Sequence, residues 1–364
     1  MSGNRVSVDC IVVGAGLLGM LSARALCAAG LSVVLLDRGE AGREASWAGG
    51  GILSPLIPWQ YADAISELVA WSQRYYPVLV NELLEQTGID AEWVQSGVLF
   101  LDTPLDARIR EWATKYSCRI QAVGHEQTRQ LDPEVSLAAA TSLLLPDVAQ
   151  IRNPLLCAAM SRSIQLQGVD LHEQTEVTDL IIRSSGIQGV QTNQGEFTAD
   201  RVVIAGGAWS SLILRQAGLE LAVEPVRGQM IMFAARPGLL RHITMHGDYY
   251  LIPRQNGLVL AGSTLEYTGY NKETTQAARD VLMEKAINLV PALSDYKIIK
   301  HWAGLRPGTS DGVPFIGEHP EIRGLYVNTG HFRNGVIMAP ASAQLLLDCM
   351  LERDSFTPFS PYAL

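Results

Sequence analysis

The 364-residue sequence has few cysteines, and they form no recognisable pair. The five that it contains are Cys10, Cys27, Cys118, Cys157 and Cys349. They are odd in number and scattered, whereas a secreted protein that is held together by disulfides shows an even and closely spaced set. We therefore expect free thiols and a cytoplasmic protein.

The sequence also lacks an excess of positive charge and a long apolar segment. Lys and Arg number 28 against 37 Asp and Glu, which gives a net charge of -9. Nucleic acid binding needs a basic surface, and a membrane span needs about 20 apolar residues. The apolar N-terminal stretch is interrupted by Asp9 and Arg24, which argues against a signal peptide. We expect small-molecule partners, with no nucleic acid and no membrane.

Motifs of two further classes are missing. His242 and His246 have the spacing of two metal ligands, but their segment is typical of strand and turn, and no third ligand is near in the sequence. The stretch "GTSDG" lies in a loop and not in the strand-to-helix context of a nucleophile elbow, and the sequence contains no internal repeat. We predict neither a metal site nor a serine hydrolase.

The N-terminal region carries a dinucleotide-binding pattern. The β-rich run "VDCIVV" precedes Gly14, Gly16 and Gly19, a helical stretch follows to Ala29, and a second apolar run ends at Asp37. In such a βαβ unit the first glycine permits a tight turn, the second lets the backbone approach a pyrophosphate, and the third lets helix pack on strand. Asp37 is placed to accept hydrogen bonds from the adenosine ribose.

FAD and NAD share this pattern, and the C-terminal region favours FAD. The sequence "GHFRNGVIMAPASA" is a glycine-bearing loop that leads into a helix. A helix N-terminus stabilises negative charge on a reduced flavin through its dipole and free N–H groups. An ordinary helix start, with Asn334 or Gly335 near the N-cap, explains this loop equally well.

The remaining elements alternate between two kinds. Strand and helix patterns alternate near the N-terminus, from Asn153 to about residue 219, and at the C-terminal end. Long alternating strands with an Asn256-Gly257 hairpin turn follow Glu220. This pattern predicts two domains that share the chain discontinuously: residues 1–80, 151–219 and 301–364 in one, and residues 81–150 and 220–300 in the other.

Four stretches together resemble the D-amino-acid oxidase family of flavoenzymes, and within it the glycine oxidases of the thiamine pathway. They are "DCIVVGAGLLGMLSARAL", "YYLIPRQNGLVLAGST", "HWAGLRPGTSDGVPFIG" and "GHFRNGVIMAPASA". The resemblance covers essentially the whole chain. It implies a mixed α/β fold, with a Rossmann-like FAD-binding domain and a substrate domain built on an antiparallel sheet.

The resemblance also implies cofactor contacts and a non-covalent FAD. The expected contacts are Gly14, Ala15, Gly16, Gly19, Asp37, Arg38, Ala45, Ser46, Gly50, Gly51, Ile52, Val177, His331, Phe332, Arg333, Asn334, Gly335, Val336 and Ile337. Relatives suggest a homo-oligomer, possibly a tetramer. Ile52 and Leu265 stand where methionine is frequent in the family, which leaves the substrate preference open.

The catalytic residues that the resemblance implies are Tyr250, Arg306 and Arg333. Arg306 and Tyr250 would hold the substrate carboxylate, because a guanidinium binds a carboxylate through two parallel charge-assisted bonds. Neighbouring strand residues point to opposite faces, so Tyr249 replaces Tyr250 if the register differs. A buried Arg306 that pairs with Asp311 or with backbone carbonyls is the alternative. Arg254 is a weaker candidate and is expected at the rim or in a salt bridge.

The implied reaction is oxidation of glycine by O₂ to glyoxylate, ammonia and H₂O₂, with sarcosine and D-alanine as further candidates. Hydride transfer from the α-carbon to flavin N5 needs a neutral amine and no enzymic base. Three alternatives stay open: a D-amino-acid dehydrogenase, a sarcosine oxidase with flavin attached to a cysteine such as Cys349, and a non-catalytic FAD-binding subunit. The glycine imine could also supply thiazole synthesis.

Overall fold

The computed structural model describes residues 6–136 and 141–364, and a mostly parallel sheet forms its N-terminal core. The strands of this sheet pair in parallel except for the edge strand β17. Their order across the sheet is β17 (Phe315–Glu318), β18 (Leu325–Thr329), β11 (Val202–Ile204), β2 (Cys10–Val13), β3 (Val33–Leu36) and β7 (Asp170–His172). The central strands β2, β3 and β11 are buried throughout, as expected for a parallel sheet that is covered on both faces.

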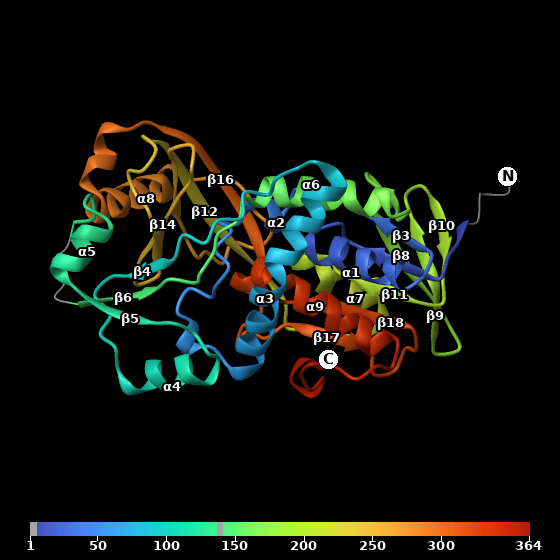
Figure 1. Cartoon of the computed structure of the whole chain (residues 1–364). Helices are drawn as coiled ribbons and strands as arrows, with labels where there is room; N and C mark the ends of the chain where they lie inside the picture. Colours follow the sequence, from blue (N-terminus) through green and yellow to red (C-terminus); the bar gives the residue numbers. More distant parts are fainter. Residues whose placement is uncertain (1–5, 137–140) are drawn as a thin grey trace.

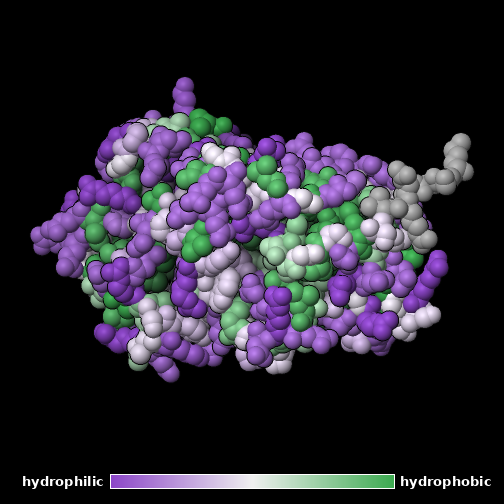
Figure 2. Space-filling model, turned by 45° about the vertical axis from the view of Figure 1, so that its right-hand side comes forward, coloured by the Kyte–Doolittle hydropathy of each residue, from purple (hydrophilic) through white to green (hydrophobic). Residues whose placement is uncertain are grey.

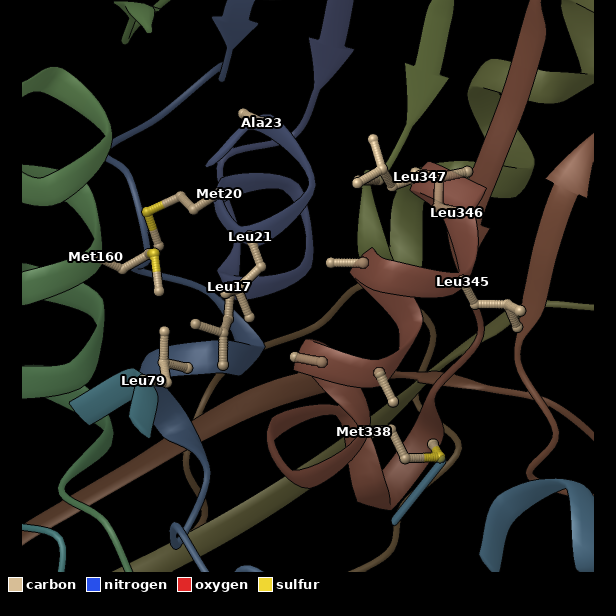
Figure 3. Packing of buried hydrophobic residues seen from close by; sticks show 14 of the residues in the cluster. Leu17, Met20, Leu21, Ala23, Leu79, Met160, Met338, Leu345, Leu346 and Leu347 are labelled. Carbon is tan, nitrogen blue, oxygen red and sulfur yellow. The ribbon is translucent and has the colours of Figure 1, made fainter. Parts of the chain in front are cut away.

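Long apolar helices pack on one face of this sheet. They are α1 (Leu17–Ala28), α3 (Asp63–Thr87), α6 (Asn153–Leu166) and α9 (Gly335–Met350). Helix α1 lies between α6 and α9, and its Met20 lies beside Met160 of α6 (Figure 3). A helix that is apolar on most of its circumference, as α1 and α9 are, is stable only in such a core.

A larger sheet forms the other end of the molecule. Its order is β16 (Ile298–Gly308), β12 (Glu224–Ala234), β15 (Leu258–Gly262), β14 (Tyr249–Pro253), β13 (Ile243–His246), β4 (Val98–Phe100), β6 (Thr141–Leu145) and β5 (Gln121–Gly124). Every pair is antiparallel except β13 with β4. The predicted hairpin joins β14 to β15, and Gly257 takes a φ of +88° there.

Helix α8 (Gln276–Leu289) covers one face of the larger sheet, and smaller elements complete the fold. These are α2 (Ala45–Ala48), α4 (Ala107–Lys115), α5 (His125–Leu131), α7 (Ser210–Leu214) and the small sheet of β1 (Val6–Ser7), β10 (Gly195–Thr198), β9 (Gly186–Thr192) and β8 (Val177–Arg183). The predicted mixed fold, with a Rossmann-like part and a second part built on a largely antiparallel sheet, is confirmed.

The two large sheets lie at opposite ends of an elongated molecule, and β16 runs between them (Figure 1). Strand β16 spans the boundary that the sequence placed at residue 301, and its register with β12 continues to Gly308. The division into domains stays a prediction.

Polar side chains cover most of the face shown in Figure 2, with apolar residues in small groups between them. Within the described part of the chain, no helix is long and apolar enough to cross a membrane.

Candidate active site

A cavity of about 540 Å³ opens beside the carboxyl ends of β2, β3 and β11. Ligands of open α/β sheets bind at this edge of the sheet, and the volume lies in the range of cofactor pockets. The predicted residues that line the cavity are Gly14, Gly16, Asp37, Arg38, Ala45, Ser46, Val177, Arg306, His331, Phe332, Arg333, Gly335 and Val336. The fold thus brings together segments from four distant parts of the sequence.

The glycine loop at the start of α1 has no room for a side chain at Gly14. Gly14 has a φ of +104°, and a Cβ there would lie 2.5 Å from the carbonyl oxygen of Ala205. The Ala15 N–H donates to Asp37 Oδ2 at 2.7 Å, and the Leu17 N–H donates to Ser46 Oγ at 2.9 Å. The loop is therefore preformed, with backbone exposed to the cavity.

Asp37 serves this loop directly. Besides the bond from Ala15, its Oδ1 accepts from the Gly39 N–H at 2.8 Å. Burial raises the pKa of Asp37, and these two hydrogen bonds act against that rise. The carboxylate thus fixes the turn and also lines the cavity.

Other predicted residues lie behind the cavity wall: Ala15, Gly19, Gly50, Gly51, Ile52, Tyr250, Asn334 and Ile337. Gly19 serves helix packing, because a Cβ there would lie 1.8 Å from the Gly14 oxygen. A Cβ on Gly51 would likewise lie 2.0 Å from the carbonyl oxygen of Ile151. Ile337, in the first turn of α9, is buried in the core. The Nδ2 of Asn334 is buried and has no partner among the described residues.

The cavity also has walls that the sequence reasoning did not assign. They include Thr175, Glu176, Gly206, Gly207, Ala208, Trp209, Leu212 and Ile213. The sequence signal for these residues is the run "RVVIAGGAWS", a buried strand that ends in glycines. Because β11 pairs in parallel with β2, the glycine turns that follow the two strands lie at the same edge of the sheet. The guanidinium of Arg38 lies 4.0 Å from the centre of the Trp209 ring, a cation–π contact at the cavity wall.

The loop before α9 carries a buried neutral histidine. His331 Nε2 lies 2.8 Å from Ser342 Oγ, and burial lowers the pKa of His331 to about 3. Arg333, on the same loop, is mostly buried and lies 4.0 Å from the exposed Asp248. The loop therefore presents one cation to the cavity, and the imidazole beside it is uncharged at neutral pH.

Arg306 projects from β16 over the face of the larger sheet. Its Nη2 donates to Ser263 Oγ at 2.8 Å and its Nη1 to the Thr264 carbonyl at 3.2 Å. Both acceptors are neutral, and among the described residues no carboxylate forms an ion pair with Arg306. Asp311 instead accepts from the Val313 N–H at 3.0 Å, so Arg306 bonds to a carbonyl and a hydroxyl and not to Asp311. Its positive charge stays available for a ligand.

Tyr250 and Tyr249 lie on opposite faces of β14. Tyr250 shares a cluster with Met230 and Ile252, and a Cβ on Gly262 would lie 2.9 Å from its hydroxyl. Tyr249 lies in the cluster under α8, with the Lys285 ammonium 4.3 Å from its ring. Burial lowers the pKa of Arg306, while Tyr250 acts in the opposite direction. Tyr250 is thus the tyrosine on the side of Arg306.

Arg254 differs from the expected rim or salt-bridged residue. It is buried and donates to Gln150 Oε1 at 2.9 Å, to the Ile151 carbonyl at 3.0 Å and to the Gly50 carbonyl at 2.9 Å. Burial lowers its pKa to about 10. Arg254 therefore joins β14 to the Gly50 loop from behind the cavity.

Comparison with known proteins agrees with this geometry. The profile of the family described as FAD dependent oxidoreductase matches residues 9–349. The chain belongs to this family of FAD-dependent oxidoreductases. The bare glycine turns at Gly14 and Gly206, with Gly16 on the wall between them, leave the backbone open to a pyrophosphate, which fits the FAD that the family binds.

Relatives in this FAD-dependent oxidoreductase family are similar along their whole length. The chain is 43% identical to a glycine oxidase of Pseudomonas aeruginosa over 97% of both chains. It is 40% identical to a glycine oxidase of Pseudomonas putida over 98% of both. The crystal structure of glycine oxidase from Geobacillus kaustophilus superposes with a TM-score of 0.94 at 30% identity, over 99% of this chain and 98% of that one.

Proposed function

We propose that this protein is an FAD-dependent oxidase of glycine, which it converts with O₂ and water to glyoxylate, ammonia and H₂O₂. The similarity to glycine oxidases along the whole chain supports this function. The observation that carries it is Arg306, a guanidinium at the cavity wall whose hydrogen bonds to the described residues go to neutral oxygens. Such a cation binds a carboxylate, which every amino acid carries.

In this proposal Arg306 and Tyr250 hold the carboxylate, and Arg333 adds a second positive charge from the loop before α9. Met230, Ile252 and Tyr250, which do not line the cavity themselves, pack closely against Gly50. A Cβ on Gly50 would lie 2.6 Å from Ile252 and 3.4 Å from both Met230 and Tyr250. Close packing at this place favours a substrate without a large side chain. Glycine fits best, and sarcosine and D-alanine are the next candidates.

Bound FAD supplies the acceptor for two electrons. The residues of the chain orient the substrate, and positioning of this kind provides a large part of the rate. His331 is neutral at pH 7 because burial lowers its pKa to about 3, so it adds no further cation beside the substrate's amino group. The substrate must lose its ammonium proton before oxidation, and the rate of flavin reduction should therefore increase towards alkaline pH.

The test is to mix the purified yellow protein with glycine in the absence of air. Loss of the flavin's visible absorbance is expected, followed by its return with H₂O₂ formation when oxygen is admitted. A dehydrogenase would be reduced by the amino acid but would reoxidise slowly in oxygen. A sarcosine oxidase would prefer sarcosine, and a non-catalytic subunit would not bleach at all. Persistent yellow colour with saturating glycine would refute the proposal.

We further propose a cytoplasmic homo-oligomer, possibly a tetramer, that supplies the glycine imine for thiazole synthesis. The free thiols of the five cysteines support the compartment. Relatives named "Bifunctional protein ThiO/ThiG", of which this chain matches about half, support the link to thiamine: one from Trichormus variabilis is 29% identical over 53% of its length. Light scattering of the purified protein tests the oligomeric state.

A further inference from the structure

A second arginine lies behind Arg306 on the other face of the same sheet. Arg306 passes over Gly228 of β12, where a Cβ would lie 2.2 Å from its guanidinium. Side chains alternate along a strand, so Arg227 and Gln229 point to the opposite face. Gln229 there bonds to Thr275 at the start of α8. The strand β12 thus separates two cations that have different surroundings.

Arg227 is paired with Glu266, which lies in the segment that follows β15. The two residues exchange backbone hydrogen bonds of 2.8 and 2.9 Å, and Arg227 Nη2 lies 2.5 Å from Glu266 Oε2. Arg227 Nη1 also donates to the Glu273 carbonyl at 2.9 Å. Arg227 is only 5% exposed, so its charge is held in one place.

The segment after β15 connects Glu266 to Arg306. Thr264 donates its hydroxyl to Glu266 Oε1, at 2.5 Å, and its carbonyl accepts from Arg306 at 3.2 Å. Gln229 Nε2 donates to the same Glu266 oxygen at 2.8 Å. The charge of Glu266 also acts on Arg306, since it contributes to raising the pKa of that guanidinium. Without a counterion, Glu266 would compete with any anion that Arg306 binds.

We propose that Arg227 is a positioning residue that acts on Arg306 through Glu266. It holds the Glu266 carboxylate on the rear face of β12 and neutralises it, so that Arg306 keeps its full charge for the substrate carboxylate. This inference rests on the proposed function of Arg306 as the carboxylate-binding group. The side chains of Arg227 and Glu266 are 6% and 26% exposed, so water screens this pair only in part and its charges act on neighbouring groups.

The test uses the FAD-loaded protein and acetate, a carboxylate without an amine, whose binding is followed by the change in the visible flavin spectrum. In Arg227→Met the unpaired Glu266 should weaken acetate binding and raise the KM for glycine at least fivefold, with kcat at saturating glycine within about twofold of wild type. The double variant Arg227→Met/Glu266→Gln removes both charges and should bind acetate within twofold of wild type. Arg227→Lys should fall between wild type and Arg227→Met.

Arg236→Met is the matched control, because Arg236 follows the other end of β12 and pairs with Glu134 on the surface, at 2.7 Å. Its acetate affinity should equal that of wild type. If Arg227→Met loses its FAD, the acetate affinity of the double variant alone tests the proposal. Neutral side chains of similar volume can replace such an ion pair with little loss of stability. A double variant that binds acetate more than tenfold worse shows that the pair is only a scaffold and overturns the proposal.

The same experiment separates this inference from the proposed function. Wild type that binds acetate and does not oxidise glycine refutes the function and leaves the role of Arg227 standing. Wild type that oxidises glycine, together with an Arg227→Met variant of unchanged acetate affinity, refutes the inference alone. Wild type that binds no acetate overturns both.

Discussion

At the scale of single residues, Arg306, Arg333 and His331 determine the charge at their part of the cavity wall. Among the described residues, Arg306 donates to neutral oxygens, and Arg333 lies 4.0 Å from the exposed carboxylate of Asp248. His331 is kept neutral by burial, which lowers its pKa to about 3. The site therefore offers two positive charges and no negative one among these residues, which is the arrangement that an amino-acid carboxylate requires.

Replacing Arg306 with lysine keeps the charge and removes the planar pair of donors. One charge-assisted bond contributes about 1.5–3 kcal/mol, so the KM for glycine and the Kd of acetate should increase about 10- to 100-fold. Steady-state kinetics and a spectral titration measure these changes. Arg353→Lys, at an exposed position after α9, should behave as wild type. An unchanged acetate affinity in Arg306→Lys would exclude Arg306 as the carboxylate-binding residue.

His331 should make the protein less stable in acid. Its pKa is about 3 in the folded state and about 6.5 in an unfolded chain. Between these values only the unfolded state binds the proton, so the free energy of unfolding falls as pH decreases below 6.5, by about 2 kcal/mol at pH 5. Above pH 6.5 the effect vanishes.

Urea unfolding of the FAD-loaded protein at pH 7 and pH 5 measures this effect. The loss of stability between the two pH values should be smaller by about 2 kcal/mol in His331→Gln than in wild type. His125→Gln, which changes an exposed histidine, should retain the full loss. Equal losses in all three proteins would contradict the buried neutral state of His331.

At the scale of elements, the turn between β2 and α1 has no room for a side chain at Gly14 or Gly19. Gly14 combines a φ of +104° with contact to the Ala205 backbone, and Gly19 contacts Gly14 itself. Gly30, at the other end of α1, has a similar φ of +94° but open space around it. Helix α1 is thus flanked by two glycines with positive φ, and of these two only Gly14 lies where an added Cβ would collide with other atoms.

Gly14→Ala should yield protein that folds with little or no FAD, because the added Cβ would displace the strand-to-helix turn or the Ala205 backbone. The ratio of flavin to protein absorbance in purified samples measures the loss. Gly30→Ala adds the same methyl group at the same kind of φ, with a backbone strain of about 1 kcal/mol and no collision. It should retain FAD, and an equal loss in both variants would refute the packing argument.

At the scale of the whole molecule, the cavity is the place where both large sheets meet. Its wall includes Leu305 and Arg306 from β16 of the larger sheet, together with residues that follow β2, β3, β11 and β18. Trp302 of β16 also donates to the Ala48 carbonyl at 2.9 Å, and so joins the larger sheet to α2. A cofactor in this cavity contacts both parts of the structure.

Removal of FAD should therefore lower the Tm of the whole chain. FAD at 100 times its Kd contributes about 2.7 kcal/mol, which corresponds to about 3 °C for a chain of this length. Differential scanning fluorimetry of the apoprotein with added FAD measures the increase. FMN, which lacks the adenosine half that Asp37 and the Gly14 turn would bind, should raise the Tm less. Equal effects of FMN and FAD would contradict the placement of adenosine at this turn.

The predictions from sequence were most complete where neighbouring residues interact. The βαβ unit from Val8 to Asp37 and the hairpin at Asn256-Gly257 depend on local periodicity and turn chemistry, and the structure has both. The elements between residues 103 and 145 were not predicted, because α4, α5, β5 and β6 are short, with four to nine residues each. Trp209, which follows β11, was likewise not assigned.

The sequence by itself determined the dinucleotide-type core, which depends on residue types at fixed local spacing, and its resemblance to a family of flavoenzymes indicated FAD and the arginine in "GLRPGT". Only the tertiary structure decided that Tyr250 and not Tyr249 lies on the side of Arg306, and that Arg254 supports the Gly50 loop. It alone paired Arg227 with Glu266, 39 residues away in the sequence. Strand register and side-chain burial set these contacts, and both depend on packing between segments that are far apart in the chain.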